Sequence, residues 1–280
     1  MKILIFIFLL SVSSVCTSKP AANQWATVTQ PAKTSDSTQS IGTYTAGCLR
    51  SAVSLPANGT GYQLMRLSRE RYYGHPDLKR FIENIAWTTA IQYRSVLLIG
   101  DLGQARGGPM SSGHRSHQTG LDVDIWYLLS QTAATRSLGF DERETWSSPS
   151  VLAAKSDAID SSQWSLTHEK VLEAAARMPE VERIFVHPSV KRLLCTRKTA
   201  HNWLRKIRPW WGHDDHFHVR LKCPKNNHDC RGQEPIPEGD GCDASLAWWF
   251  SAEAKAEALA PKKPAPRPLL PPQCDAVLNE

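Results

Sequence analysis

The chain has 280 residues, of which 41% are hydrophobic and 21% are charged, and its formal net charge is +6. This length predicts one or two domains, and this composition excludes a chain that is disordered throughout. The basic balance favours an anionic partner, such as nucleic acid, a membrane surface or an acidic wall polymer. Because Lys and Arg are spread along the chain, a solvated basic surface explains the charge equally well.

The amino end has the pattern of a secretory signal peptide. Lys2 precedes an apolar run over residues 3–12, and small residues suitable for cleavage follow that run. The run is too short for a membrane anchor, which needs ~20 apolar residues. We therefore expect residues 1–18 to be a signal peptide, cut at residues 16–18 or later near Ala22. The mature chain is then exported and has no membrane span.

Disulfide bonds are expected in the exported part. The chain has seven cysteines, and removal of Cys16 with the signal peptide leaves Cys48, Cys195, Cys223, Cys230, Cys242 and Cys274. An even number of cysteines in an exported chain indicates disulfides, although spacing alone leaves their pairing open. Since no CxxC pair occurs, a structural zinc knuckle is not expected.

Composition divides the mature chain into three parts. Residues 19–45 are rich in Ser, Thr, Ala, Gln and Pro, which predicts a flexible leader. Residues 46–260 form one continuous globular stretch, and residues 261–280 form a proline-rich tail. Cys274 lies in that tail, and we expect it to hold the tail against the globular domain.

Hydrophobic periodicity predicts both helices and strands in the globular stretch. In chain order these are a helix around residues 78–85, a strand at 95–99, a strand within 119–129, a helix at 168–178, a strand at 181–186, a short helix at 203–207 and a strand at 216–221. The mixture predicts an α+β fold, in a single domain with a small, mostly antiparallel sheet braced by disulfides.

Two short segments concentrate histidine and aspartate. The first, SSGHRSHQTGLDVDIW, contains His114, His117, Asp122 and Asp124. The second, WWGHDDHFHVRLKCP, contains His213, Asp214, Asp215, His216 and His218. A hydrolytic zinc site uses three protein ligands and leaves one position for water. Two imidazoles and one carboxylate from these segments would supply such a set.

Strand geometry indicates which side chains meet. In LDVDIW the apolar residues point to one side of the strand, and Asp122 and Asp124 point to the other. His216 and His218 are two residues apart and therefore face the same side. If the two strands are neighbours, His117, Asp124 and His218 converge on one metal. His216 would then lie beside the metal as a proton acceptor, and Asp122 would orient a ligand histidine.

Other residues of these types have simpler interpretations. Asp214 and Asp215 suit a turn before the second strand. Trp210 and Trp211 are as compatible with a core position as with a platform for substrate. The remaining histidines are interpreted as structural or surface residues: His75, His168, His187, His201 and His228.

The segments GHRSHQTGLDVDIW and RPWWGHDDHFHVRLKCP closely resemble the penicillin-insensitive murein endopeptidase family. This family is related to D-Ala-D-Ala metallopeptidases and lysostaphin-type enzymes. The resemblance implies a periplasmic zinc enzyme that cleaves the D-alanyl to meso-diaminopimelyl cross-link of peptidoglycan. It also implies that no serine-type activity is present, so that β-lactams do not acylate the protein.

The resemblance further assigns roles to individual residues. It implies zinc ligation by His117, Asp124 and His218, with His114 as a further metal-associated histidine. It implies that His216 is the general base and that His213 helps to hold substrate or the developing oxyanion. The implied disulfide pairs are Cys48–Cys274, Cys195–Cys242 and Cys223–Cys230.

This chain departs from the family pattern at one point. The family can carry a second metal, held by an Asp and a His from the middle of the chain. The corresponding stretch here, AAKSDAIDSSQW, contains Asp157 and Asp160 but no histidine. These two aspartates are therefore weak candidates for a second metal, and solvated loop carboxylates are an equal interpretation.

The function expected from the sequence is murein DD-endopeptidase activity, with zinc as cofactor and peptidoglycan cross-links as the partner. Two alternatives use the same residues: a zinc D,D-carboxypeptidase, and a wall-binding module with an idle metal site. A nucleic-acid partner suits the net charge but is opposed by the export signal. The oligomeric state is left open by the sequence.

Overall fold

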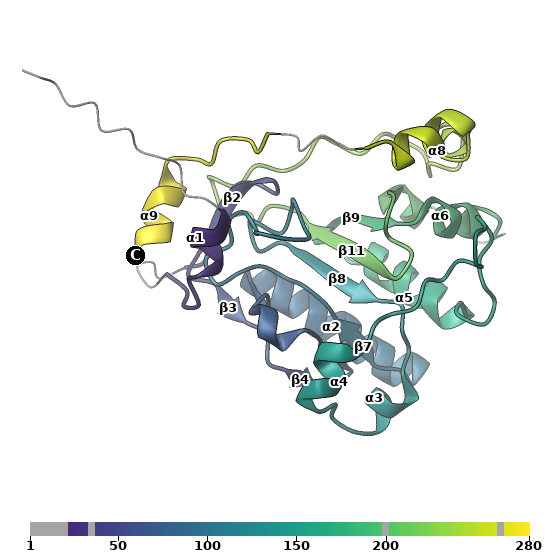
Figure 1. Ribbon diagram of the computed structural model, residues 1–280, viewed down its shortest axis with the longest axis horizontal. Coiled ribbons are helices and arrows are strands. Elements are labelled where there is room, and N and C mark those ends of the chain that lie inside the picture. The colour runs from purple at the N-terminus through teal and green to yellow at the C-terminus, as the bar shows by residue number, and fades with distance from the viewer. Residues whose placement is uncertain (1–21, 33–36, 198–201, 262–265) are drawn as a thin grey trace, which may run out of the picture.

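A computed structural model of the protein describes residues 22–32, 37–197, 202–261 and 266–280 (Figure 1). The expected signal peptide, residues 1–18, lies outside this part of the chain. Within the described residues the protein mixes helices and strands in one domain, as expected. No helix in that part is both long and apolar enough to cross a membrane.

A mixed sheet forms the centre of the domain. Among the described residues its strand order is β10-β9-β11-β8-β7-β5-β4. The strands are β4 (Asn58–Gly59), β5 (Tyr62–Leu64), β7 (Leu97–Ile99), β8 (Asp122–Trp126), β9 (Val181–Val186), β10 (Ile207–Pro209) and β11 (His216–Leu221). Only β9–β10 and β5–β7 pair in parallel, so the sheet is mostly antiparallel, as predicted. It is larger than predicted because β4, β5 and β10 are too short to show a period in sequence.

Two long helices, α2 (Pro76–Tyr93) and α5 (Leu166–Arg177), contact each other and cover one face of this sheet. Phe81 and Ile82 of α2 are fully buried in the same core cluster as Val123 of β8 and Val219 of β11. Helix α2 starts with proline, whose fixed φ suits the first helical turn. The apolar side chains of β8 and β11 thus face the helices, and their alternate side chains face the opposite side.

Shorter elements surround the sheet. Strands β3 (Val53–Ser54) and β6 (Tyr73–Gly74) form a separate pair, and two segments are 3-10 helices, η1 (Leu67–Arg69) and η2 (Asn202–Lys206). The remaining helices of this group are α3 (Gln131–Thr135), α4 (Phe140–Thr145), α6 (Pro188–Cys195), α7 (Ala244–Trp248) and α8 (Ala252–Leu259). The short helix expected at residues 203–207 is η2, which leads directly into β10.

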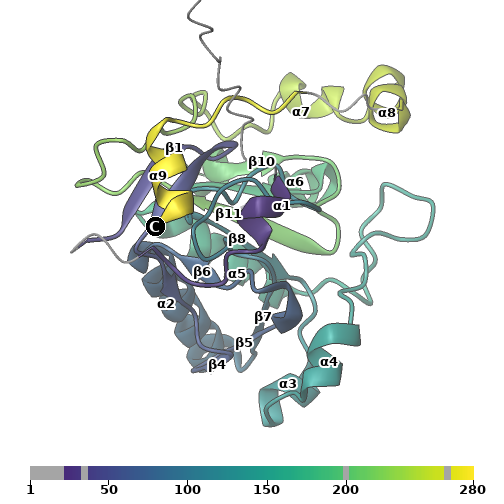
Figure 2. The same ribbon diagram turned by 60° about the vertical axis from the view of Figure 1, so that its left-hand side comes forward.

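The two ends of the described chain meet. Helix α1 (Ala22–Ala26), the hairpin of β1 (Gln39–Thr43) and β2 (Ala46–Arg50), and helix α9 (Gln273–Asn279) lie together (Figure 2). Trp25 is only 1% exposed and belongs to a small apolar cluster with Cys48 and Cys274. The prediction of a flexible leader over residues 19–45 is therefore wrong for residues 22–32 and 37–45. The composition of this segment suggested flexibility, and it could not show that residues from the far end of the sequence bury Trp25.

Three disulfides are present in the described part of the chain: Cys48–Cys274, Cys195–Cys242 and Cys223–Cys230. They are the same pairs that the family resemblance implies. The Cys48–Cys274 bond holds α9 against β2, so the end of the proline-rich tail is attached to the domain.

Candidate functional site

The site is built on two neighbouring strands. β8 and β11 pair antiparallel, with His218 opposite Asp124 and Arg220 opposite Asp122. The condition on which the sequence argument depends, that these strands are neighbours, is therefore met. Because Val123 and Val219 face the core, the aspartates and His218 project from the other face.

A turn before β8 brings His117 to the same place. His117 has φ 67°, a left-handed conformation that non-glycine residues seldom adopt. Its Nδ1–H donates to the Leu102 carbonyl at 2.9 Å, which helps to hold the ring. Gly120 follows with φ 69°, and a Cβ at that position would lie 2.3 Å from the Leu49 side chain. Only glycine fits this turn without displacing a neighbour.

The Asp124 carboxylate is the centre of a histidine cluster. Its Oδ1 lies 3.5 Å from His117 Nε2 and 3.3 Å from His218 Nδ1. His216 Nε2 is 3.6 Å from the same oxygen, and His114 Nε2 is 3.3 Å from Oδ2. Two histidines that precede β8 and two histidines of β11 thus surround one carboxylate, although they are far apart in sequence. Four of the residues expected at the site from sequence therefore lie around the fifth, Asp124.

The protonation pattern of this cluster fits a cation. A carbonyl can only accept, so His117 Nδ1 carries the proton and Nε2 is a bare lone pair. That Nε2 and Asp124 Oδ1 are both buried without a hydrogen-bond partner. Two acceptors that face each other repel unless a cation lies between them. His114, His117 and Asp124 form a group whose ligand atoms lie within 4.8 Å of one another, close enough to hold a metal ion.

His218 is held in a similar way, but its two ring nitrogens have exchanged roles. Its Nε2 lies 2.6 Å from Asp122 Oδ1, and a buried carboxylate acceptor there fixes the proton on Nε2. Nδ1 is then the free lone pair that faces Asp124. Asp122 is fully buried and also accepts from Arg220 Nε at 2.7 Å. Asp122 thus occupies the orienting position that the sequence suggested for it.

Sequence reasoning missed residues that support His114. Asp101 Oδ2 lies 3.1 Å from His114 Nε2 and accepts from Arg71 Nη1 at 2.8 Å. Arg220 was also missed, although it follows His216 and His218 at the same spacing of two along β11. Its guanidinium lies 3.7 Å from the centre of the Tyr44 ring. A signal for Asp101 does exist: it follows a buried strand and Gly100, where a polar side chain often marks a site at a strand end.

The charges of the cluster favour ionised carboxylates. Burial acts to raise the pKa of Asp101, but His114 and Arg71 outweigh it and lower the pKa to about 2. Burial also acts to raise the pKa of Asp124, yet the neighbouring histidines, His216 first, hold it well below its ordinary value. A permanently charged carboxylate surrounded by imidazoles is a suitable donor set for a divalent ion.

Two further histidines lie beside the cluster. His216 Nδ1 and Asp215 Oδ1 are 2.5 Å apart, which turns the opposite ring nitrogen, Nε2, toward Asp124. Burial acts to lower the pKa of His216, but Asp124 and Asp215 outweigh it and raise the pKa to about 9. The ring of His213 lies 4.9 Å from that of His216, and its Nδ1–H donates to the Trp211 carbonyl at 3.0 Å. Burial first, then His216 and His218, lower the His213 pKa to about 3.

A cleft of about 410 Å³ opens over these residues. Its lining includes His114, Phe185, Trp210, His213 and His218. A larger hollow of about 900 Å³ lies elsewhere, between the start of α2 and the Cys223–Pro224 turn, and it is lined by none of the clustered histidines. The smaller cleft is the one at which bound substrate would meet the candidate metal ligands.

The other candidate residues lie apart from the cluster. Asp160 accepts from the backbone and hydroxyl of Ser162, and Asp157 pairs with Lys255 Nζ at 2.6 Å. The side chains of His75 and His187 cap the first turns of α2 and α6, respectively. These two histidines therefore have the structural roles expected of them, while His201 lies outside the described residues.

Comparison with known proteins gives one consistent result. The family model described as penicillin-insensitive murein endopeptidase matches residues 40–279. A penicillin-insensitive murein endopeptidase of Klebsiella pneumoniae (strain 342) is 42% identical over 261 residues, covering 93% of this chain and 92% of the relative. The protein of that name from Escherichia coli (strain 55989 / EAEC) is 40% identical over 261 residues, with the same coverage. That from Haemophilus influenzae is 38% identical over 258 residues, covering 91% of this chain and 88% of the relative.

Proposed function

The chain belongs to the penicillin-insensitive murein endopeptidase family, and from that premise we propose that it is a zinc-dependent murein DD-endopeptidase. Its substrate in this proposal is the D-alanyl to meso-diaminopimelyl cross-link of peptidoglycan, and its compartment is the periplasm. The observation that carries the proposal is the orphaned pair of acceptors, His117 Nε2 and Asp124 Oδ1, beneath an open cleft. Three disulfides suit an exported protein.

The ligands that we propose are His117, Asp124 and His218, with His114 as a further metal-associated residue. Zinc bound there would supply a Lewis acid that polarises the scissile carbonyl and lowers the pKa of a water molecule to about 7. Asp122 keeps the proton of His218 on Nε2, and the Leu102 carbonyl keeps that of His117 on Nδ1. Both rings therefore present lone pairs toward Asp124 before any ion binds, which lowers the reorganisation that binding requires.

His216 is the proposed proton acceptor. Asp215 fixes its Nδ1, so that Nε2 faces the space beside Asp124. The Asp124 charge is a principal cause of the raised His216 pKa. A cation bound to that carboxylate would offset its charge and return the His216 pKa toward its ordinary value. The neutral ring then takes a proton from water and returns it to the leaving amine.

The His213 hydrogen bond limits what this residue does. Because its Nδ1–H donates to the Trp211 carbonyl, the neutral ring presents Nε2 as an acceptor. An acceptor binds a substrate N–H but does not stabilise an oxyanion. Of the two roles that the family resemblance implies for His213, we therefore propose that it holds substrate.

Replacing His216 by Ala is expected to lower the rate of cross-link cleavage by about 100-fold or more while bound zinc is retained. Loss of the proton acceptor slows turnover, whereas the three ligands remain in place. Zinc content by mass spectrometry and the rate on cross-linked muropeptide dimers are measured on the same sample. Loss of zinc from His216→Ala would show instead that His216 is a ligand.

The proposed function is tested directly by metal removal. Zinc-loaded protein is expected to convert cross-linked muropeptide dimers into monomers, and a chelator is expected to stop this conversion. Re-addition of zinc should restore it, because we expect the three disulfides to hold the fold while the ion is absent. Dimers that stay intact with the zinc-loaded protein would contradict the proposal, and release of free D-alanine from pentapeptides would identify a carboxypeptidase.

A further inference from the structure

Four tryptophans adjoin one another beside the cleft, with Trp249 in contact with each of the other three, and we call them the tryptophan row: Trp210, Trp211, Trp249 and Trp248. The Trp249 ring lies at the centre of this tryptophan row, with its centroid 6.3 Å from that of Trp210 and 5.4 Å from that of Trp211. Trp248 continues the row at 5.4 Å from Trp249. Residues from two segments far apart in sequence, residues 210–211 and the end of α7, thus build one aromatic surface.

The tryptophan row begins inside the cleft. Trp210 lines the cleft together with Phe185, and their ring centroids are 6.0 Å apart. The Phe185 ring in turn lies 5.3 Å from that of His218, a proposed zinc ligand. The row therefore leads outward from the position of the scissile bond to the surface, and a substrate longer than one peptide would meet it.

Packing among the rings of the row leaves part of their surface open to solvent. Neighbouring rings within it meet at interplanar angles between 54° and 81°, so their contacts are tilted or edge-to-face and none is face-to-face. The two outer members remain solvent-exposed, Trp210 at 55% and Trp248 at 46%. Exposed indoles that adjoin one another are unfavourable in water and are typical of ligand-binding surfaces.

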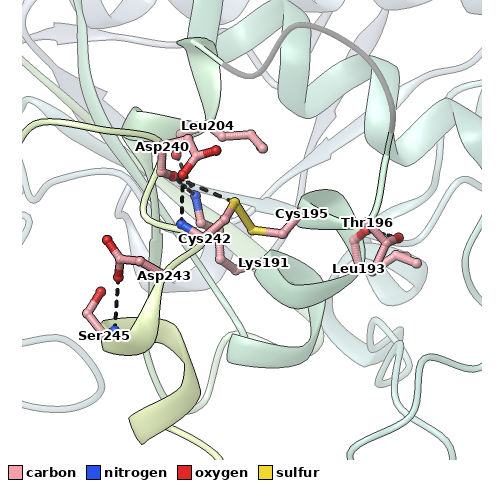
Figure 3. The surroundings of a disulfide bond; sticks show 9 residues. All are labelled: Lys191, Leu193, Cys195, Thr196, Leu204, Asp240, Cys242, Asp243 and Ser245. Atoms are coloured by element: carbon pink, nitrogen blue, oxygen red, sulfur yellow. Dashed lines mark hydrogen bonds between the residues drawn. A yellow bond between two sulfur atoms is a disulfide. The ribbon is translucent and has the colours of Figure 1, made fainter.

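The segment that carries the outer half of the row is held firmly (Figure 3). The Cys195–Cys242 disulfide fixes the chain just before α7 to the end of α6. Buried Lys191 donates from Nζ to the Asp240 carbonyl at 2.5 Å and to the Leu204 carbonyl at 2.7 Å. Asp243 caps the first turn of α7 by accepting from the Ser245 backbone. Trp248 and Trp249 are thus presented from a fixed base, as a binding platform requires.

We propose that the tryptophan row binds the glycan strand of peptidoglycan, with sugar rings stacked on the indole faces. This inference rests on the proposed function, because a murein cross-link joins peptides that are themselves attached to glycan strands. One face of a pyranose ring presents C–H groups, which pack against an apolar indole face while the hydroxyl groups stay in water. A row that starts at the cleft lies where the glycan of a bound cross-link must pass.

The test compares two substrates that contain the same cross-link. One is intact peptidoglycan, and the other is cross-linked peptide dimer freed of sugar by an amidase. Trp248→Ala is expected to lower cleavage of intact peptidoglycan about fivefold, the value of one good aromatic contact. Cleavage of the sugar-free dimer should change less than twofold. Trp87→Ala is the matched control, because Trp87 is 53% exposed on α2, away from the row.

Each outcome decides the inference. A selective loss on intact peptidoglycan supports glycan binding, whereas an equal loss on both substrates assigns the row to the peptide and overturns it. No loss on either substrate also overturns it. If the unaltered protein cleaves neither substrate, the proposed function fails, and binding of peptide-free glycan strands, compared between unaltered protein and Trp248→Ala, decides the row separately.

Discussion

Replacing Asp124 by Asn is expected to lower the rate of cross-link hydrolysis by more than about 100-fold. Loss of a residue that only hydrogen-bonds a metal ligand already costs up to about 100-fold, and Asp124 is a proposed ligand itself. Within the part of the chain that the structure describes, Asp124 is the one carboxylate shared by His114, His117, His216 and His218. Asn keeps the size of the side chain but removes the negative charge that attracts a cation. Its amide would also direct N–H groups at the histidine lone pairs, where a cation should lie.

The Asp124→Asn measurement needs zinc content and rate from the same preparation. Asp141→Asn is the control, since Asp141 is an exposed aspartate on α4 and should leave both quantities unchanged. Zinc retained in full with turnover lost would remove Asp124 from the ligand set. Turnover that persists in Asp124→Asn would contradict the metal mechanism as a whole.

Removal of the Cys48–Cys274 bond, by changing both cysteines to Ala, is expected to cost about 4–5 kcal/mol of unfolding free energy. The bond closes a loop with a sequence separation of 226, so it removes much entropy from the unfolded chain. A domain is stable by only about 5–15 kcal/mol, so this loss is a large fraction of the total. Urea unfolding of the double Ala variant and of the unaltered protein, both without reductant, measures it.

The Cys223–Cys230 bond offers a matched comparison within the same chain. Its sequence separation is 7, so the double Ala variant is expected to lose only about 2 kcal/mol. Contacts of Arg106 with the Val277 and Leu278 carbonyls still hold α9 when Cys48–Cys274 is absent. Equal losses in the two double variants would show that loop entropy is not the origin of the stabilisation.

The histidine and aspartate cluster was predictable because strand alternation is a local property. The strand at residues 216–221 has the same bounds in sequence and structure, and its period of two places His216 and His218 on one side. Pairing of β8 with β11 was a condition that sequence could state but not establish. The supporting contacts of Asp101 and Arg71 were missed, since they depend on where the chain passes in three dimensions.

The ends of the chain were poorly predicted for a related reason. Helix α1 has five residues, too few for a hydrophobic period, and β1 is the polar segment QSIGT. Both exist because tertiary contacts stabilise them, which no local pattern reports. Trp25 shows this most clearly, since its apolar cluster includes Cys274 and Val277.

The meeting of the two ends constrains when the protein can mature. A chain emerges amino end first, so the thiol of Cys48 must wait for a partner that arrives 226 positions later. Until then Trp25 and Cys48 lack their neighbours from α9, and their apolar surface is open to the wrong contacts. The native bond can therefore form only after Cys274 has emerged, and a premature bond from Cys48 to an earlier-emerging cysteine, such as Cys195, is the misfolding route that this topology leaves open.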